Sequence, residues 1–303
     1  MKKRKKLSKK SLWRIAFLFW LAVFGILVWR QIPDDKLHLF FCDIGQGDAI
    51  LARHKSFQVL IDGGRVRNSG KLLKCLAEAM PFWDRKIEMV VATHPDEDHF
   101  GGLIEVARRY QVGVFLHNGL DKPDSWQFQK LKNLVIEQEI YSRKAVAGER
   151  FRVSKMYFDI LWPGVETKPT KKILPKGFLN LESFSGDFNQ QSIVLHLRFG
   201  QFDSLLTGDA TVEVEQILAW RKKLFPVEVL KLGHHGSKTS TGEEILLATQ
   251  PQLAIISVGE NNHFGHPAPE VLERLKQYEI PYLRTDKQGT IEITSDGRKW
   301  EVK

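Results

Sequence analysis

The segment Thr93-His94-Pro95-Asp96-Glu97-Asp98-His99 decides how this chain folds and where its chemistry lies. The apolar run 87–92 precedes it and predicts a buried strand, and Gly101-Gly102 leads from it into a helix expected over 101–110. A strand followed by a polar loop presents that loop at the carboxyl edge of a sheet, where open α/β folds keep their sites. Two imidazoles and two carboxylates crowd together at low cost only when a cation neutralises the acids. The segment therefore predicts four metal ligands: His94, Asp96, Asp98 and His99. The alternative is a solvated acidic turn whose histidines make ordinary hydrogen bonds.

Three further segments have the same form, an apolar strand that ends in polar side chains. They are Thr207-Gly208-Asp209, Gly233-His234-His235-Gly236-Ser237 and Asn261-Asn262-His263-Phe264-Gly265-His266-Pro267. Taken alone, a Gly-Asp pair is usually a turn, and paired histidines can be one packed ring beside an exposed one. Together with the first segment they offer nitrogen and oxygen ligands without sulfur, a set that suits Zn²⁺, Mn²⁺ or iron.

This ligand set predicts two divalent metal ions, because carboxylates can bridge a pair of ions that share a hydroxide and clamp an in-line displacement. We expect His94 and Asp96 to hold one ion and Asp98 and His99 the other, with Asp209 bridging them. Either His234 or His235 would complete the second site. A metal-bound water would be the nucleophile.

The composition limits the class of protein. The 303 residues are 43% hydrophobic, enough for a sizeable core in one large domain or two small ones. The formal net charge of +9 comes from the N-terminal tail, because residues 1–30 contain nine Lys or Arg and no Asp or Glu. The rest of the chain has 36 basic and 36 acidic residues, so the net charge is no evidence for a nucleic-acid-binding face.

The same tail predicts a membrane anchor. The apolar run 15–29 follows a basic cluster, and Leu12 and Trp13 extend it toward the length that spans a bilayer. Positive charge before the run favours a cytoplasmic N-terminus and an extracytoplasmic body. A cleaved signal peptide is the alternative, although the run ends in 27–31 without the small residues that cleavage needs. We expect a basic cytoplasmic tail at 1–11, a single-pass transmembrane anchor at 12–30, a linker at 31–36 and a hydrolase-like domain at 37–303.

The body predicts two similar halves of alternating strands and helices. Strands are expected at 37–42, 49–53, 57–61, 87–92, 112–116, 192–199, 204–206, 227–232, 253–258, 281–283 and 290–294, and extended segments at 134–140 and 151–161. Helices are expected at 70–80, 101–110, 125–133, from 211 onward, at 241–249 and at 269–277. Two sheets packed together with helices outside would bury such a pattern.

Two other features are less specific. Residues 163–188 predict a surface excursion whose lysines are either solvated or hold an anionic polymer: Lys168, Lys171, Lys172 and Lys176. Cys42 and Cys75 lie in apolar surroundings and predict small core residues. They could form a disulfide outside the cell, but one pair of cysteines does not establish it.

At these residues the chain resembles the metallo-β-lactamase superfamily, and more closely the C-terminal hydrolase domain of ComEC-type competence proteins, which take up DNA. That family carries a His-x-Asp-x-Asp-His loop, which 94–99 matches, and an opening motif similar to Asp43-Ile44-Gly45-Gln46-Gly47-Asp48-Ala49. Its Asp-Gly-Gly, Thr-Gly-Asp, His-His-Gly-Ser and Asn-x-Tyr/Phe-Gly-His-Pro motifs are similar to 62–64, 207–209, 234–237 and 262–267. The resemblance covers roughly 37–300.

The resemblance implies an α/β fold, a four-layer αββα sandwich with two zinc or manganese ions in a groove at one edge. It also implies phosphodiester hydrolysis. On this basis we expect Asp98 and His266 to act in catalysis, and Asn189, Ser237 and Asn262 to contact the substrate. His196 lies within a predicted strand and is expected to be structural. ComEC proteins form a channel from many membrane helices, whereas this chain has one candidate helix, so a DNA-uptake channel protein is an expected partner.

Three hypotheses of function follow. The first is a membrane-anchored, extracytoplasmic, metal-dependent phosphodiesterase or nuclease that acts on DNA; because the body is neutral, local groups such as Arg65, Arg67 or the lysine loop would grip the polymer. The second keeps the chemistry but takes a cell-envelope phosphodiester, such as a choline phosphate or teichoic acid unit. The third is a non-catalytic binding module of the same fold, which a loss of ligands would mark.

Overall fold

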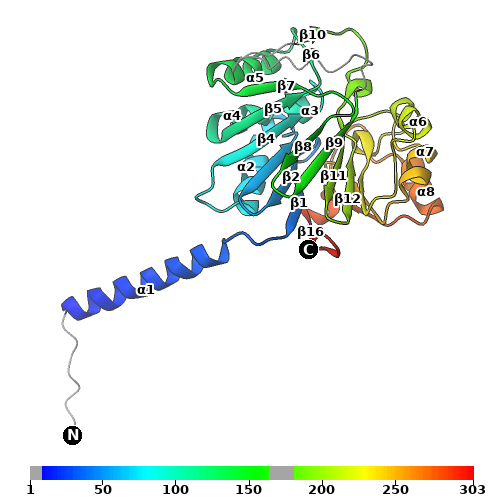
Figure 1. Ribbon diagram of the computed structural model, residues 1–303. Helices are drawn as coiled ribbons and strands as arrows, with labels where there is room; N and C mark the ends of the chain where they lie inside the picture. Colours follow the sequence, from blue (N-terminus) through cyan, green and yellow to red (C-terminus); the bar gives the residue numbers. More distant parts are fainter. Residues whose placement is uncertain (1–8, 164–180) are drawn as a thin grey trace.

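The computed structural model describes residues 9–163 and 181–303. The first residues of the expected basic tail and the four lysines of the expected surface excursion lie outside this range. The described part starts with one long apolar helix, α1 (Lys9–Arg30), and then folds into a body of two sheets covered by helices (Figure 1).

Helix α1 contains the whole of the expected anchor and begins three residues before it. Its length and composition are sufficient to cross a membrane, and none of its residues is buried. It extends away from the body (Figure 1), and its Phe24 ring lies 6.4 Å from the ring of Phe82, which is half exposed on the body. The boundaries expected for the tail, anchor, linker and domain remain predictions.

Within the described residues, the first sheet contains eight strands. In spatial order they are β17 (Trp300–Val302), β16 (Ile291–Ser295), β1 (Leu37–Phe41), β2 (Ile50–His54), β3 (Phe57–Ile61), β4 (Lys86–Ala92), β5 (Gln111–His117) and β7 (Tyr141–Lys144). Helices α2 (Ser69–Ala79), α4 (Leu103–Arg109) and α5 (Trp126–Glu137) cover its outer face. Helix α2 shows why: it buries Leu72, Cys75, Leu76 and Ala79, whose spacing of three and four residues places them on one side.

The second sheet contains seven strands in the part of the chain that the structure describes. In spatial order they are β15 (Tyr282–Arg284), β14 (Leu253–Ile256), β13 (Val229–Lys231), β12 (Phe202–Leu206), β11 (Val194–Phe199), β9 (Met156–Trp162) and β8 (Arg150–Val153). Helices α6 (Val212–Trp220), α7 (Glu243–Thr249) and α8 (Pro269–Gln277) cover its outer face. Short elements complete the described chain: η1 (Val66–Asn68), α3 (Glu97–Phe100), the paired β6 (Leu120–Asp121) and β10 (Glu182–Ser183), η2 (Phe188–Gln191), η3 (Gly233–Gly236) and α9 (Thr285–Gln288).

The main core lies between the two sheets. In β1, the alternate residues Leu37, Leu39 and Phe41 join this inner core, whereas Phe40 packs on the opposite face under the helices. A strand buried on both faces explains why 39–42 is apolar without alternation. The four-layer αββα sandwich predicted from the sequence is therefore confirmed.

The prediction failed in parts of the periphery. Residues 134–140 were expected to be extended, but α5 continues to Glu137 because Phe128, Leu131 and Val135 form one buried stripe on its surface. The β-branched residues near its end favour a strand by propensity, and tertiary packing overrides that preference. Strand β17 was not predicted.

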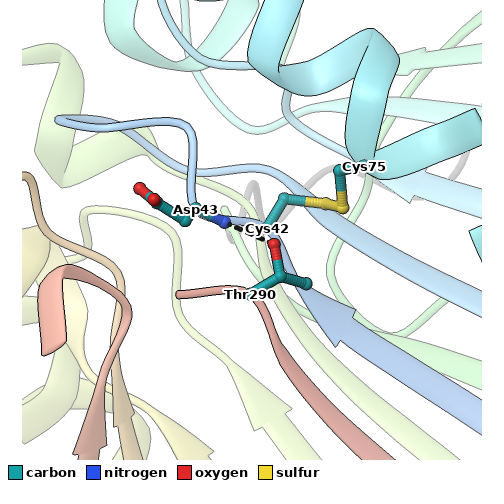
Figure 2. The surroundings of a disulfide bond; sticks show 4 residues. All are labelled: Cys42, Asp43, Cys75 and Thr290. Carbon is teal, nitrogen blue, oxygen red and sulfur yellow. Dashed lines mark hydrogen bonds between the residues drawn. A yellow bond between two sulfur atoms is a disulfide. The ribbon is translucent and has the colours of Figure 1, made fainter. Parts of the chain in front are cut away.

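A disulfide joins Cys42 to Cys75 and ties the end of β1 to α2 (Figure 2). Both cysteines are buried, as expected, but they are bonded rather than free core residues. The next residue, Asp43, donates its backbone N–H to Thr290 Oγ1 at 3.0 Å (Figure 2). The loop 43–49 is thus fixed at its start from two sides.

The strand directions create one polar edge. Strands β1, β3 and β4 of the first sheet run the same way, as do β12, β13 and β14 of the second. The polar segments singled out in the sequence follow the carboxyl ends of these strands. Helix α1 enters β1 at its amino end, so the anchor joins the body at the opposite edge.

Candidate metal centre

Asp209 lies at the centre of the polar edge, where four imidazoles surround its carboxylate. It follows β12 and is buried. From Asp209 Oδ2, the Nε2 atoms of His99, His235, His234 and His94 lie at 3.1, 3.7, 3.8 and 4.0 Å. These rings follow β4 and β13, which belong to different sheets. The two sheets therefore meet at this carboxylate.

The second nitrogen of each inner ring is held by the protein. The Nδ1–H of His99 donates to Asp62 Oδ2 at 2.7 Å, and that of His235 donates to the carbonyl of Ser257 at 3.0 Å. The Nδ1 of His94 lies 3.1 Å from Thr93 Oγ1 and 3.3 Å from Ser192 Oγ. In the neutral form of each ring, this hydrogen-bond network places the proton on Nδ1, so that Nε2 is the nitrogen that would face a metal.

The hydrogen bonding of the Nε2 atoms shows whether these residues suit a metal. The Nε2 atoms of His94, His99 and His235 and the Oδ1 atom of Asp209 are buried without a hydrogen-bond partner in the described part of the protein. Buried polar atoms are normally satisfied, so four such atoms around one point call for a common partner. A divalent cation supplies it, and imidazole nitrogen and carboxylate oxygen suit zinc or manganese. The residues therefore fit a metal, with His94, His99, His235 and Asp209 as the inner ligands.

Asp96 and Asp98 lie further out, at the rim of this cluster. Asp96 Oδ2 is 3.5 Å from His94 Nε2, and Asp98 Oδ2 is 4.0 Å from His235 Nε2. Their side chains are 31% and 20% exposed, whereas the inner imidazoles of His94, His99 and His235 are at most 1% exposed. All seven expected metal ligands thus come together, four of them buried and three toward solvent.

The paired histidines reach Asp209 through an unusual backbone. His234 and His235 adopt φ of 46° and 57°, the left-handed region that residues with a side chain rarely occupy. Such strain persists where the surroundings impose it, and here it turns both rings toward one carboxylate. The sequence left the choice between them open; His235 is buried, and His234 is the more exposed of the two.

Asp48 and Lys231 form a buried ion pair that the sequence reading missed. Lys231 Nζ binds Asp48 Oδ2 and also donates to the carbonyl of Gly208 at 3.0 Å, and both side chains are almost inaccessible. Asp48 lies 3.4 Å from His235 Nδ1, close enough to join a metal cluster. We nevertheless exclude it from the ligands, because Lys231 is fully buried and cannot turn away to solvent, so its ammonium neutralises Asp48 and would repel a divalent cation.

The residues expected in catalysis and at the substrate have the following contacts in the structure. His266 lies beside His234, with ring centroids 5.6 Å apart. Asn189 in η2 has a buried Oδ1 without a partner in the described residues. Ser237 shares its hydroxyl with Thr239 Oγ1 at 3.0 Å, and Asn262 uses its amide to brace its own loop, donating to Gly259 and His266 carbonyls. Their contacts with substrate remain predictions.

His196 is outside the site. Its Nε2 lies 2.6 Å from Asp203 Oδ1, and its ring packs edge-on against Phe225. The sequence reading expected a structural role for it. Asp203 and His196 therefore provide a matched acid–imidazole pair away from the metal centre.

The buried acids and imidazoles of the cluster shift one another's pKa values. Burial raises the pKa of the Asp209 carboxyl, but His99 and His235 hold that pKa well below its usual range. Burial lowers the pKa of His99, yet Asp209 and Asp62 raise it well above its ordinary value. Without a metal, protons thus neutralise the site, and metal binding would release them. Burial, aided by His235 and His234, lowers the pKa of His266 to about 4, so this ring is uncharged at neutral pH.

The missed residues carried weak signals. Asp62 appears in the sequence within a Gly-rich turn after a strand, Asp48 within the quoted opening motif, and Lys231 as a single charge in an apolar strand. None of these patterns indicates which distant side chain the group will meet.

The sequence of this chain is similar to those of known proteins. Residues 42–260 match the family model described as the metallo-beta-lactamase superfamily. The chain is 32% identical to ComE operon protein 3 of Bacillus subtilis, over 84% of this chain and 33% of that protein. It is 29% identical to Recombination protein 2 of Haemophilus influenzae and 26% identical to Competence protein ComA of Neisseria gonorrhoeae, over 92% and 90% of this chain. The chain spans about a third of the length of each of these relatives.

Solved structures agree on the fold alone. The metallo-beta-lactamase fold protein YhfI from Bacillus subtilis superposes with a TM-score of 0.55, covering 84% of this chain and 99% of that chain at 11% identity. CmlA, a diiron beta-hydroxylase from Streptomyces venezuelae, gives a TM-score of 0.51 at 15% identity, covering 87% of this chain and 54% of that chain.

Proposed function

Because this chain belongs to the metallo-β-lactamase superfamily, we propose that it is a metal-dependent phosphodiesterase that cleaves DNA at the outer face of a membrane. One observation carries the proposal. Three imidazoles present unpartnered, buried Nε2 atoms to the carboxylate of Asp209, and the protein fixes the opposite nitrogen of each ring. Such prepared ligands have a clear use in holding a divalent cation.

In the proposed reaction, residues of this chain would bind the metal ions, accept a proton and contact the substrate. Two divalent ions, zinc or manganese, would polarise the phosphoryl oxygen and lower the pKa of a bound water. His94, His99, His235 and Asp209 would bind them, helped at the rim by Asp96, Asp98 and His234. Asp98, which is partly exposed, would accept the proton of the attacking water. His266, uncharged at neutral pH, would offer a hydrogen bond to the substrate.

Support for DNA as the substrate comes from the relatives. Competence protein ComA is named for competence, and the chain matches it over 90% of its own length. A channel protein for DNA uptake is the partner that this similarity suggests, since the chain spans only about a third of such relatives.

Two features support a location outside the cytoplasm. The apolar α1 follows a tail of Lys and Arg, which favours a cytoplasmic N-terminus and places the body on the other side. The disulfide between Cys42 and Cys75 suits an oxidising compartment.

The proposal is tested with the full-length protein in detergent, supplied with Mn²⁺ or Zn²⁺. We expect about two ions per chain by metal analysis and hydrolysis of DNA. Asp98→Asn should abolish hydrolysis of bis(p-nitrophenyl) phosphate, whereas Asp203→Asn, in the matched pair away from the site, should retain it. A protein that takes up no metal, or an Asp98→Asn variant with normal turnover, contradicts the proposal.

A second candidate is supported by the charge balance of the chain. Outside the N-terminal tail, acidic and basic residues are equal in number, which suits a small envelope phosphodiester as well as a polymer. Turnover of a choline phosphate diester without cleavage of DNA would favour it. A non-catalytic role is disfavoured because every expected ligand is present.

A further inference from the structure

Two cations flank the metal centre on different chain segments. Arg65, in the segment after β3, lies with a guanidinium nitrogen 3.3 Å from Asp98 Oδ2. Lys122, after β6, pairs with Asp96 Oδ1. The two rim carboxylates of the ligand loop thus each meet a positive side chain, and the two side chains come from opposite sides of that loop in sequence.

Each of these cations also lies over a phenylalanine ring. The guanidinium carbon of Arg65 is 5.6 Å from the centroid of Phe264, and Lys122 Nζ is 5.0 Å from the centroid of Phe188. Phe264 is 48% exposed, so part of its ring is accessible to solvent. A cation and an aromatic face at each flank make two similar binding elements.

The Phe264 side connects to the metal centre through a series of rings. His263 lies 4.1 Å from Phe264, Phe264 lies 5.7 Å from His266, and His266 lies 5.6 Å from His234, all measured between centroids. His263 and Phe264 are exposed, whereas His234 borders Asp209. The series therefore leads from solvent to the site where a phosphodiester would react.

This arrangement combines groups that bind single-stranded nucleic acids. Cations bind phosphates, and aromatic faces stack on unpaired bases without strong sequence preference. The body has no excess of basic residues, so a nucleic acid must be held by a few local groups. A small phosphodiester would need one flank at most, whereas a strand that crosses the centre meets both.

We propose that Arg65 with Phe264 and Lys122 with Phe188 clamp a single nucleic-acid strand across the metal centre. The cations hold the phosphates next to the scissile one, and the phenylalanine rings stack on unpaired bases. The clamp rests on the proposed function and specifies its substrate as a single strand, because paired bases in a duplex present no free face.

Binding of the full-length protein to short fluorescent strands tests the clamp without cleavage. An oligothymidylate and an abasic strand of equal length and charge are titrated in detergent with EDTA, and fluorescence anisotropy gives both Kd values. We expect tighter binding of the thymidylate. Phe264→Ala should reduce this preference roughly 5- to 150-fold, the range for loss of one stacked base. Phe264→Tyr should restore it, and Phe188→Ala should also reduce it.

Matched variants show whether a change in binding affinity comes from loss of base stacking, from loss of charge or from a general disturbance of the structure. Arg65→Gln and Lys122→Gln should weaken both strands alike and lower the salt-dependence slope by about one each. Arg108→Gln, on an outer helix where Arg108 pairs with Glu105 at 2.8 Å, and Trp220→Ala, at an exposed site on α6, should bind as wild type. Phe264→Leu keeps an apolar side chain without a ring and should behave as Phe264→Ala.

A kinetic comparison adds an independent readout in Mn²⁺. Thymidine 5′-(p-nitrophenyl phosphate) and methyl p-nitrophenyl phosphate share a leaving group, and the ratio of their kcat/KM values should fall in Phe264→Ala. Equal losses for both esters and both strands, or no change in either preference, overturn the clamp. If wild type hydrolyses neither ester but still prefers the base-bearing strand through Phe264, the clamp stands and the phosphodiesterase proposal fails.

Discussion

At the scale of single residues, the partners of the imidazoles matter as much as the imidazoles themselves. Asp62 holds His99 from behind at 2.7 Å and also accepts hydrogen bonds from the backbone N–H and hydroxyl of Thr93. One carboxylate therefore orients a ligand ring and anchors the start of the ligand loop. Groups in this position set both the tautomer and the basicity of a metal ligand.

Asp62→Asn should lower metal affinity about 10- to 100-fold, because the amide is a poorer acceptor for the His99 N–H. Titration calorimetry of the metal-free protein with Mn²⁺ or Zn²⁺ measures this change. Asp203→Asn removes a comparable acid beside His196 and should leave metal affinity unaltered. Unchanged affinity in Asp62→Asn would mean that His99 is not a ligand.

A second residue-scale prediction concerns Glu215 in α6, which is buried and accepts the backbone N–H groups of Thr241 and Gly242 at 2.7 Å. Burial raises its pKa to about 7, from 4.5 in an unfolded chain. The folded state therefore keeps a proton that the unfolded state releases. Its contribution to stability is complete below about pH 4.5 and is lost as the pH rises to about 7, by up to about 3 kcal/mol.

Denaturant unfolding at about pH 5 and about pH 8 checks this sign. Glu215→Gln, which cannot ionise, should flatten the fall in unfolding free energy over that interval, even if the lost hydrogen bond lowers its stability at both pH values. A variant with the same slope as wild type would show that another group titrates.

Much of the site could be predicted at this scale, and the omissions have a common cause. His94, Asp96, Asp98, His99 and Asp209 were expected as ligands because each follows an apolar strand, and the fold brings them together. Asp48 and Lys231 form their ion pair 183 positions apart in sequence. Local patterns show that a buried lysine needs an acid, but they do not show which one.

At the scale of elements, the strands were predictable because burial on both faces leaves long apolar runs. The extent of α5 was not, since its last turn is made of residues with strand propensity and depends on tertiary packing. The left-handed turn at His234 and His235 was also beyond local rules, which favour glycine in that region. A functional constraint overrides the local preference there.

The disulfide yields a prediction for two elements together. Cys42 and Cys75 are 33 positions apart, and closing a loop of this length removes entropy from the unfolded chain worth about 4 kcal/mol. Cys75→Ser should therefore lower the unfolding free energy by about that amount in oxidised protein. Denaturation of wild type with and without a thiol reductant gives the comparison.

The same variant supplies its own control. In the presence of reductant, Cys75→Ser and wild type should unfold at nearly the same denaturant concentration. A large difference under reducing conditions would assign the effect to packing of the side chain, because no bond then remains to be lost.

At the scale of the whole molecule, the four-layer architecture could be predicted from two halves of alternating strands and helices, and the N-terminal helix from its charge and hydropathy.

The orientation of the protein in a membrane is a further prediction. Protease added to intact cells or protoplasts should digest the body, because the basic tail favours the cytoplasm. Protection of the body, with digestion only after lysis, would reverse the orientation.

The place where α1 enters the body has one more consequence. Helix α1 is joined through a short linker to the amino end of β1, whereas the carboxylates of the candidate metal centre follow the carboxyl ends of parallel strands. The two ends of the five-residue β1 are about 17 Å apart. With α1 in a bilayer, the candidate metal centre would lie at the edge of the body opposite the one where the anchor joins it. Head groups beside the anchor would then be poorly placed to reach this edge, whereas a molecule that approaches from the side away from the membrane would reach it directly.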